Sequence, residues 1–304
     1  MSPRLLAHAA LFTVALFYAG NYLVAKIVMN DDFVGPLGFV LLRVVFATTL
    51  FWLISLVLRH EPIDRRDWGL FAACGLTGVA INQSLFLSGL ELTTPAHASL
   101  IMTVSPILVL LFSYLILKDR ITSRKIGGIL LGCAGAIVLM TFGKEVTGSP
   151  DYLAGDIMVM MNATSYALYL VLVKKLTAKY MPLTVIKYVF SFGLLFVLPL
   201  GFRQVVAIEW HTFSTATWLS VAYVLVCVTF LAYLLNTYAL VRVKPATVGF
   251  YIYLQPLLAT ILSVMFDMES LSFPKVFAGV LIFFGVYLVS DFKISAPLRA
   301  DIKK

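Results

Sequence analysis

Apolar runs of about 20 residues recur along the whole chain, and each is long enough to cross the roughly 30 Å hydrocarbon layer of a membrane as a helix. The composition agrees, because 61% of the 304 residues are hydrophobic and only 12% are charged. Lipid offers the backbone no hydrogen-bond partners, so we expect helices whose peptide groups are satisfied internally. The ten predicted spans are residues 5–29, 34–58, 68–90, 95–117, 125–142, 157–173, 183–202, 216–240, 245–266 and 275–290.

Scarce residue types recur at one offset of 150 positions. The clearest pairs are Trp68 with Trp218, Pro95 with Pro245, Pro106 with Pro256, Lys125 with Lys275 and Gly135 with Gly285. Leucine matches would arise by chance in so apolar a chain, whereas matched Trp and Pro residues indicate an internal duplication. We therefore predict a first five-helix repeat over residues 1–146 and a second over residues 155–292, followed by a basic cytoplasmic tail at residues 293–304.

The positive charges predict the orientation of the spans. With the N-terminus placed in the cytoplasm, 17 of the 23 Lys and Arg residues fall in cytoplasmic segments and three on the outer side. This is the bias expected of a bacterial-type inner-membrane protein with both termini cytoplasmic. An odd number of spans in each repeat then turns the second repeat upside down relative to the first. The predicted fold is all-α and integral to the membrane, with ten transmembrane helices in two inverted repeats.

Further motifs accompany this pattern. They are Tyr18-Ala19-Gly20-Asn21-Tyr22 followed by Lys26, Pro36 followed by Arg43, and the acidic residues Asp119 and Glu269 after the fourth and ninth spans. With these motifs and the paired prolines, the chain resembles the drug/metabolite transporter superfamily, and within it the EamA group of bacterial metabolite exporters. The resemblance covers nearly the whole chain. It implies a ten-helix carrier of amino acids, their derivatives, nucleotides, sugars or drugs, without defining the substrate.

Polar side chains within spans are costly in lipid and are expected to face the protein interior. They concentrate in spans one, three, four, six, eight and nine, which form three pairs of repeat mates. The candidate substrate-binding residues are Tyr18, Asn21, Tyr22, Asn82, Gln83, Ser99, Met102, Thr103, Asn162, Ser165, Tyr166, Tyr169, Tyr233, Asn236, Tyr251 and Gln255. The pattern predicts a central cavity lined by these six helices, with the other four at the periphery. The alternative role for each polar group is to join two helices or to bond its own backbone.

Two prolines lie within predicted spans. Pro106 and Pro256 each remove a backbone hydrogen bond to the residue four positions earlier, and each predicts a kink. Because the two are repeat mates, the kinks are expected to face a shared cavity as a hinge or ligand contact. A static kink that serves packing is the alternative.

Two residues are singled out by charge. Arg43 lies within span two and is expected to pair with Glu91 or Asp31, or to meet a substrate carboxylate. His97, near the outer end of span four, is interpreted as the one membrane-proximal group other than the termini that titrates near neutral pH. A gating or proton-accepting role for His97 is weighed against a plain interfacial position.

The predicted function is secondary transport of small amphipathic metabolites by alternating access around the cavity. Export of amino acids or their derivatives is the leading prediction. A zwitterion with an apolar tail suits a nearly uncharged cavity, whereas a phosphorylated substrate would need more than one deep cation. No Asp or Glu lies at the centre of a span, so facilitated diffusion or exchange is expected. Proton coupling through His97 or a helix-end carboxylate is the alternative.

Other classes remain as alternatives. A drug or nucleoside-type transporter would share the fold, and an integral-membrane enzyme would need clustered carboxylates for Mg²⁺ or a nucleophile with its base. Neither set is found, and the three cysteines form no metal-spaced pair, so no enzyme activity, cofactor or metal is predicted. The expected partners are the lipid bilayer and a small-molecule substrate, and not nucleic acid, despite the net charge of +8. A monomer fits this organisation, and the oligomeric state is left open.

Overall fold

The computed structural model describes residues 3–29, 34–57, 61–93, 98, 101–141, 152–265 and 273–289. Within these ranges the side chains of residues 22–23, 25–29, 139–141, 152, 260, 263–264 and 275 are not part of the description. The regular secondary structure of the described residues is helical throughout, which confirms the all-α prediction for them.

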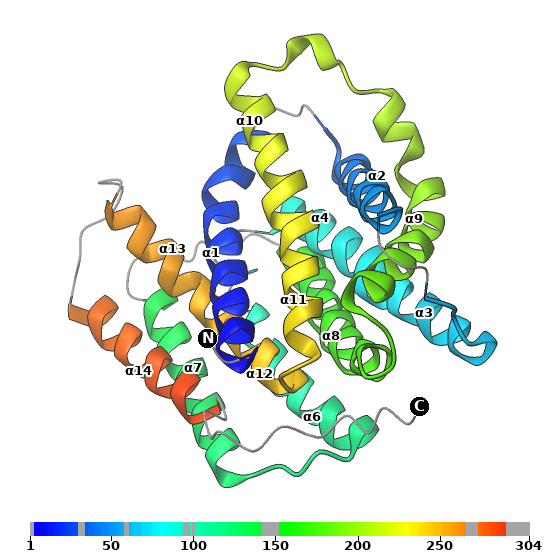
Figure 1. Cartoon of the computed structure of the whole chain (residues 1–304). Coiled ribbons are helices and arrows are strands. Elements are labelled where there is room, and N and C mark those ends of the chain that lie inside the picture. The colour runs from blue at the N-terminus through cyan, green and yellow to red at the C-terminus, as the bar shows by residue number, and fades with distance from the viewer. Residues whose placement is uncertain are drawn as a thin grey trace.

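The first half contains α1 (Pro3–Met29), α2 (Pro36–Ser55), η1 (Arg65–Asp67), α3 (Trp68–Gly75), η2 (Leu76–Ile81), α4 (Asn82–Leu92), α6 (Ser105–Leu117) and α7 (Ser123–Thr141). The second half contains α8 (Tyr152–Thr177), α9 (Pro182–Val206), η3 (Trp210–Thr212), α10 (Thr215–Tyr223), η4 (Val224–Leu231), α11 (Ala232–Leu240), α12 (Pro245–Phe250), η5 (Tyr251–Tyr253), α13 (Leu254–Met265) and α14 (Phe273–Val289). Figure 1 shows how these helices are arranged.

Among the residues that the structure describes, six stretches of helix are long and apolar enough to cross a membrane. They are Pro3–Asn21, Pro36–Ser55, Arg65–Leu92, Leu153–Thr177, Pro182–Val206 and Thr215–Leu240. Two shorter apolar helices, Ser105–Leu117 and Val276–Val289, fall within predicted spans four and ten. The chain is therefore built as a membrane protein, and the count of ten spans stays a prediction.

The third and eighth predicted spans share an unusual backbone. In each, an α-helix passes through a π-helical segment, η2 in the first half and η4 in the second, and then continues as an α-helix. The two segments overlap at the 150-residue offset, although nothing in their apolar sequences predicts the wider turn. A π-helical turn shifts the hydrogen-bond ladder and is frequent at functional sites.

The two intramembrane prolines break their spans more sharply than a kink would. Pro106 stands in the first turn of α6, after a turn at Thr103 and Val104. In span nine the chain runs through α12, tightens into the 3₁₀-helical η5, and resumes as α13 with Pro256 in its first turn. Proline lacks an N–H and its ring excludes the carbonyl four residues back, so it is best accommodated where a new helical segment starts.

Helices at matching positions of the two halves pack against each other in opposite directions. At one end of the α2–α9 pair, the main-chain N–H of Gly38 donates to Gln204 Oε1 at 2.8 Å. At the other end, the rings of Phe51 and Phe190 meet edge to face with centroids 5.2 Å apart. The early part of α2 thus meets the late part of α9, and the late part of α2 meets the early part of α9. The two helices are therefore antiparallel, and Figure 1 shows them as neighbours.

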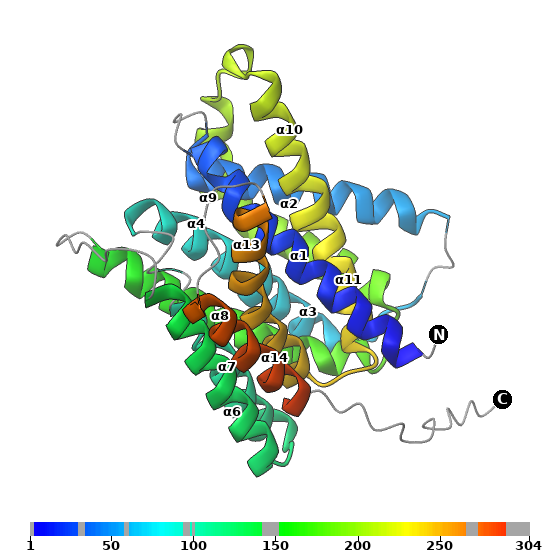
Figure 2. The same cartoon turned by 90° about the vertical axis from the view of Figure 1, so that its left-hand side faces the viewer.

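The α7–α14 pair repeats this relationship with glycines. A Cβ atom added to Gly135 would lie 2.8 Å from the main-chain oxygen of Ala278, and one added to Gly285 would lie 2.7 Å from that of Gly128. The two contacts are equivalent under the 150-residue offset, because Gly135 corresponds to Gly285 and Ala278 corresponds to Gly128. Such reciprocity requires two antiparallel helices related by a local two-fold axis, with backbones close enough to need glycine. Figure 2 shows α7 and α14 together on one flank of the bundle.

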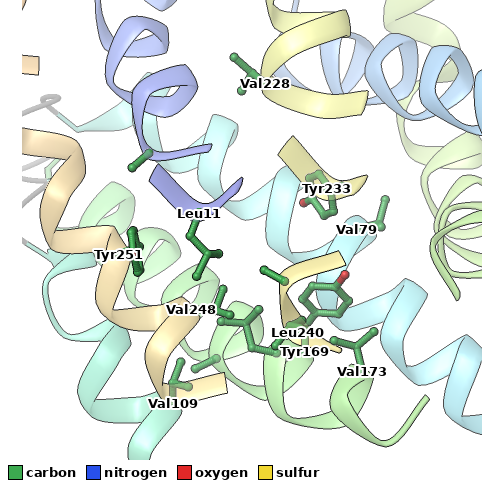
Figure 3. Packing of buried hydrophobic residues seen from close by; sticks show 14 of the residues in the cluster. Leu11, Val79, Val109, Tyr169, Val173, Val228, Tyr233, Leu240, Val248 and Tyr251 are labelled. Carbon is green, nitrogen blue, oxygen red and sulfur yellow. The ribbon is translucent and has the colours of Figure 1, made fainter. Parts of the chain in front are cut away.

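The remaining helix contacts also occur in pairs that the 150-residue offset relates, one for each half. Helix α4 packs on α8 as α11 packs on α1, and α6 packs on α8 as α13 packs on α1. The halves are therefore interleaved around a shared core. Figure 3 shows part of this core, in which Tyr169 and Tyr233 lie near Val79 of the first half.

Within the described ranges, two ion pairs join the halves outside this core. Lys244 Nζ lies 2.7 Å from Asp119 Oδ1, between the start of α12 and the end of α6. Lys179 Nζ lies 2.9 Å from Asp67 Oδ2, and the hydroxyl of Tyr180 donates to the same carboxylate oxygen. The hydrogen bond to Asp67 stabilises the charged ammonium and raises the pKa of Lys179. All four charged residues lie in segments predicted to be cytoplasmic.

Candidate substrate cavity

A cavity of about 90 Å³ lies at the centre of the helix bundle. Both halves contribute to it. From the first half it is lined by Tyr18, Asn21, Arg43, Asn82, Gln83, Phe86 and Met102, and from the second by Asn162, Tyr166, Val228, Tyr233, Ile252 and Gln255. These side chains come from α1, α2, α4, the helical residues 101–102 ahead of α6, α8, η4, α11, η5 and α13.

The structure brings many of the predicted residues together around this cavity. They are Tyr18, Asn21, Arg43, Asn82, Gln83, Met102, Asn162, Tyr166, Tyr233 and Gln255. They share one property, a polar or polarisable group on an otherwise apolar span, and the cost of exposing such a group to lipid explains why they meet in the interior. That they bind substrate stays a prediction.

Other predicted residues do not line the cavity. Ser165 Oγ instead donates to the main-chain oxygen of Thr77 at 2.8 Å, and the Tyr251 hydroxyl shares a hydrogen bond of 2.9 Å with His8 Nδ1. Thr103, Tyr169 and Asn236 are buried in contacts between helices.

Some predictions are not addressed by this cavity. Pro106 and Pro256 do not line it. Ser99, His97 and the side chain of Tyr22 lie outside the described residues.

Carbonyl groups around the π-helical segment η2 hold the two halves together. The Tyr233 hydroxyl donates to the main-chain oxygen of Gly78 at 2.9 Å, and Asn162 Nδ2 donates to that of Asn82 at 2.6 Å. Side chains of α8 and α11 thereby satisfy carbonyls of the first half, which could not remain unpaired away from water. Two cavity-lining side chains, those of Tyr233 and Asn162, are thereby held in place at and just after η2.

Two amide side chains at the cavity retain unused hydrogen-bonding capacity. Gln83 and Asn162 are 3% and 2% exposed. Neither Nε2 nor Oε1 of Gln83 makes a hydrogen bond of good geometry, and Oδ1 of Asn162 has no partner either. Because a buried polar atom without a partner costs about 1–3 kcal/mol, such atoms beside a cavity indicate a place for a polar ligand group.

Arg43 is the ionisable cation among the lining residues, and it is accompanied there by no carboxylate. Its Nε donates to Thr229 Oγ1 of η4 at 2.8 Å. The predicted pairing with Glu91 is wrong, since Arg43 forms no ion pair with any carboxylate of the described residues; Asp31 lies outside them. The expectation that span two stays at the periphery is also wrong at this position, because a buried cation is stabilised by the polar interior and not by lipid.

Sequence reasoning missed four residues. Phe86, Val228 and Ile252 line the cavity, but an apolar side chain in an apolar span carries no signal that separates a cavity wall from packing. His8 is different, because a titratable residue in the first span was visible and should have been singled out. It is 8% exposed and hydrogen-bonded to Tyr251, so the interpretation of His97 as the one such group near the membrane is wrong.

A helical membrane protein with a polar cavity shared by two matching halves has the architecture of a secondary transporter. Comparison with known families assigns the chain more closely. It belongs to the EamA-like transporter family, whose model matches it twice, over residues 5–141 and 153–291. The resemblance to the drug/metabolite transporter superfamily is thereby confirmed.

Individual relatives agree with this assignment. The chain is 27% identical over 292 residues to an uncharacterized transporter of Archaeoglobus fulgidus, covering 93% of this chain and 96% of the relative. It is 32% identical over 152 residues to a probable terminal-alkyne amino-acid exporter of Streptantibioticus cattleyicolor, covering 50% and 48% of the two chains. A protein of known crystal structure, 21% identical, superimposes with a TM-score of 0.76 over 93% of this chain and 97% of that one. This last likeness concerns the fold alone.

Proposed function

We propose that the protein is a secondary transporter that exports small amphipathic metabolites across a bacterial-type inner membrane. Amino acids or their derivatives are the favoured substrate class. The observation that carries the proposal is the central cavity, to which both halves contribute amide and tyrosine side chains but only one charge. Its volume of about 90 Å³ is small beside the roughly 300–1,000 Å³ of pockets that hold drug-sized ligands, which favours a small metabolite. Support for an amino-acid-like substrate comes from the relative named as a probable amino-acid exporter.

The proposed architecture has ten transmembrane helices in two inverted repeats, with both termini in the cytoplasm. Antiparallel packing of α2 with α9 and of α7 with α14 supports it, because repeat mates that cross a membrane in opposite directions belong to inverted halves. Transport would proceed by alternating access, in which one half rocks against the other around the cavity.

The first test is a metabolite export screen of cells that overexpress the protein, repeated with the cavity variants Asn21→Ala and Tyr166→Ala. Tyr114→Ala is the matched control, because Tyr114 is exposed on α6 away from the cavity. We expect extracellular accumulation of amino acids or close derivatives with the wild type and the control, and at least a severalfold loss with both cavity variants. Equal export by all four proteins would rule out the cavity as the transport site.

The second test addresses orientation and access with single cysteines in a chain whose Cys74, Cys133 and Cys227 are replaced. Lys175→Cys should react with an impermeant thiol reagent only from the cytoplasmic side, and Glu209→Cys only from the outside; both positions are exposed. Asn21→Cys, in the cavity, should react from either side in turn if access alternates. A position that reacts only from the side opposite to its prediction contradicts the proposed topology.

An integral-membrane enzyme is the alternative from another class. No group of His, Cys, Asp and Glu that could hold a metal ion occurs among the residues the structure describes. A purified protein that converts a metabolite without moving it across proteoliposomes would favour that class.

For energetics we propose facilitated diffusion or exchange. Flux in proteoliposomes with and without an imposed pH gradient tests this, and strict dependence on the gradient would reject it.

A further inference from the structure

We propose that Arg43 is a carboxylate-binding subsite of the cavity and that the favoured substrates are monocarboxylates whose amino group is not required. The proposal rests on the transport function above and narrows its substrate class. Arg43 is 7% exposed and lines a cavity whose lining contains no carboxylate. Removing a cation from water without a counter-charge costs several kcal/mol, so this position favours an anion brought in by the substrate.

The geometry of Arg43 leaves its two terminal amino groups available to a ligand. The Thr229 hydroxyl donates its proton to the main-chain oxygen of Val224 at 2.9 Å, five residues earlier in the π-helical η4. Having used its proton there, the hydroxyl can only accept from Arg43 Nε, at 2.8 Å. This contact orients the guanidinium, and the two terminal amino groups have no acceptor among the described residues. Paired N–H groups on a planar fork match the two oxygens of a carboxylate.

The other half of the protein shows that the fold itself needs no arginine here. At the 150-residue offset, Arg43 corresponds to Gly193 and Thr229 to Val79. These mates pack directly on one another, because a Cβ atom added to Gly193 would lie 2.5 Å from Val79 Cγ1. Equivalent positions of the fold are thus occupied by a tightly packed apolar pair, Gly193 and Val79, and by a hydrogen-bonded polar pair, Arg43 and Thr229. A pair that departs from the symmetry at the cavity wall points to ligand recognition.

The other residues that line the cavity define which further chemical groups a substrate can carry beside its carboxylate. A second negative charge, as on a phosphate, would find no second cation. An ammonium would find no carboxylate and would be repelled by Arg43. The unpartnered atoms of Gln83 and Asn162 are neutral donors and acceptors, suited to a hydroxyl, carbonyl or amide group beside the carboxylate. Phe86, Val228 and Ile252 supply an apolar wall for the tail.

The test measures binding to the purified full-length protein with four probes that share one tail. They are L-leucine, 4-methyl-2-oxopentanoate, L-leucine methyl ester and isopentylamine. We expect both acids to bind and to raise the unfolding temperature, with 4-methyl-2-oxopentanoate binding at least as tightly as L-leucine. The ester and the amine should bind at least about tenfold more weakly than the acids, the loss expected for a charged hydrogen-bonded pair. Equal binding of ester and acid, or failure of both acids to bind, overturns the proposal.

Variants then assign the effect to Arg43. Arg43→Gln should abolish the preference for acid over ester, whereas Arg43→Lys should keep the preference at lower affinity. Thr229→Val retains the guanidinium but removes the acceptor that positions it, and should weaken acids while leaving the ester unchanged. The wild-type probe series decides the proposal even if a variant does not fold. Full transport by Arg43→Gln of the compound found in the export screen would overturn the subsite and leave the transport function standing, whereas a wild type that exports nothing would refute the function itself.

Discussion

The hydroxyl of Tyr253 donates a hydrogen bond of 2.9 Å to the main-chain oxygen of Thr103, the residue 150 positions earlier in the chain. Equivalent positions of two repeats can meet in this way only beside the axis that relates the repeats. The contact therefore marks where the turn before α6 and the 3₁₀-helical η5 cross at the centre of the molecule.

Replacing Tyr253 by Phe should lower the free energy of unfolding by about 1 kcal/mol, because it removes the donor of a buried hydrogen bond between the two halves. Thermal unfolding of the purified protein in detergent measures the change. Tyr114→Phe is the control, since Tyr114 is half exposed and no hydrogen bond of its hydroxyl is seen. Equal stability of the two variants would mean that the contact contributes nothing.

Gly135→Ala should destabilise the α7–α14 pair by about 1–3 kcal/mol, because the new methyl group would lie 2.8 Å from a main-chain oxygen that cannot move aside. Gly127→Ala on the same helix is the matched control. A Cβ atom there meets nothing within 4 Å, so this change should leave stability unchanged or slightly raised. The prediction is contradicted if both alanines behave alike.

Asp119→Asn and Lys244→Gln should have similar, small and non-additive effects on stability. Their ion pair joins the two halves but is partly exposed, with 19% and 50% of the two side chains accessible, so a coupling energy of about 0.2–1 kcal/mol is expected. A double-mutant cycle measures the coupling, and it should shrink at high salt. Lys175→Gln, at an exposed position without a charged partner in the described residues, controls for loss of charge. Strict additivity would show that the pair is not formed in solution.

His8→Gln should lower stability by about 0.5–1.5 kcal/mol, since His8 joins α1 to Tyr251 of the other half through a buried hydrogen bond. If transport is uncoupled from protons, as proposed, the flux of the wild type and of this variant should be unaffected by an imposed pH gradient. His211→Gln, at an exposed position in η3, is the control. A gradient-dependent wild-type flux that is lost in His8→Gln alone would assign proton coupling to His8.

The helices were predictable because lipid leaves an apolar span no other way to satisfy its peptide groups. The stretches that became α2 and α9 follow from this argument alone. The division of span nine into α12, η5 and α13 does not, because Pro256 only forbids one hydrogen bond, and the neighbouring helices decide how the chain accommodates the loss. The π-helical segments have no distinctive composition and could not be anticipated.

The cavity was predictable only in its polar part. Asn82, Gln83 and Asn162 were identified by the cost of placing amides in lipid, and they meet in the interior. That argument could not separate Ser165, which serves a backbone carbonyl, from residues that face open space, since both are polar and buried. It also misjudged Arg43, whose partner Thr229 is distant in the sequence and becomes its neighbour only through the packing of α2 on η4.

The unbalanced guanidinium at the cavity has a consequence for energetics. An empty carrier would hold one positive charge within the membrane, whereas a carrier loaded with a monocarboxylate would be neutral. Membrane voltage acts on a translocated charge with about 2.3 kcal/mol per 100 mV. Voltage would therefore act on the unloaded return step. Because a full cycle carries one net negative charge across the membrane, the voltage and the metabolite gradient would together set the direction of net flow.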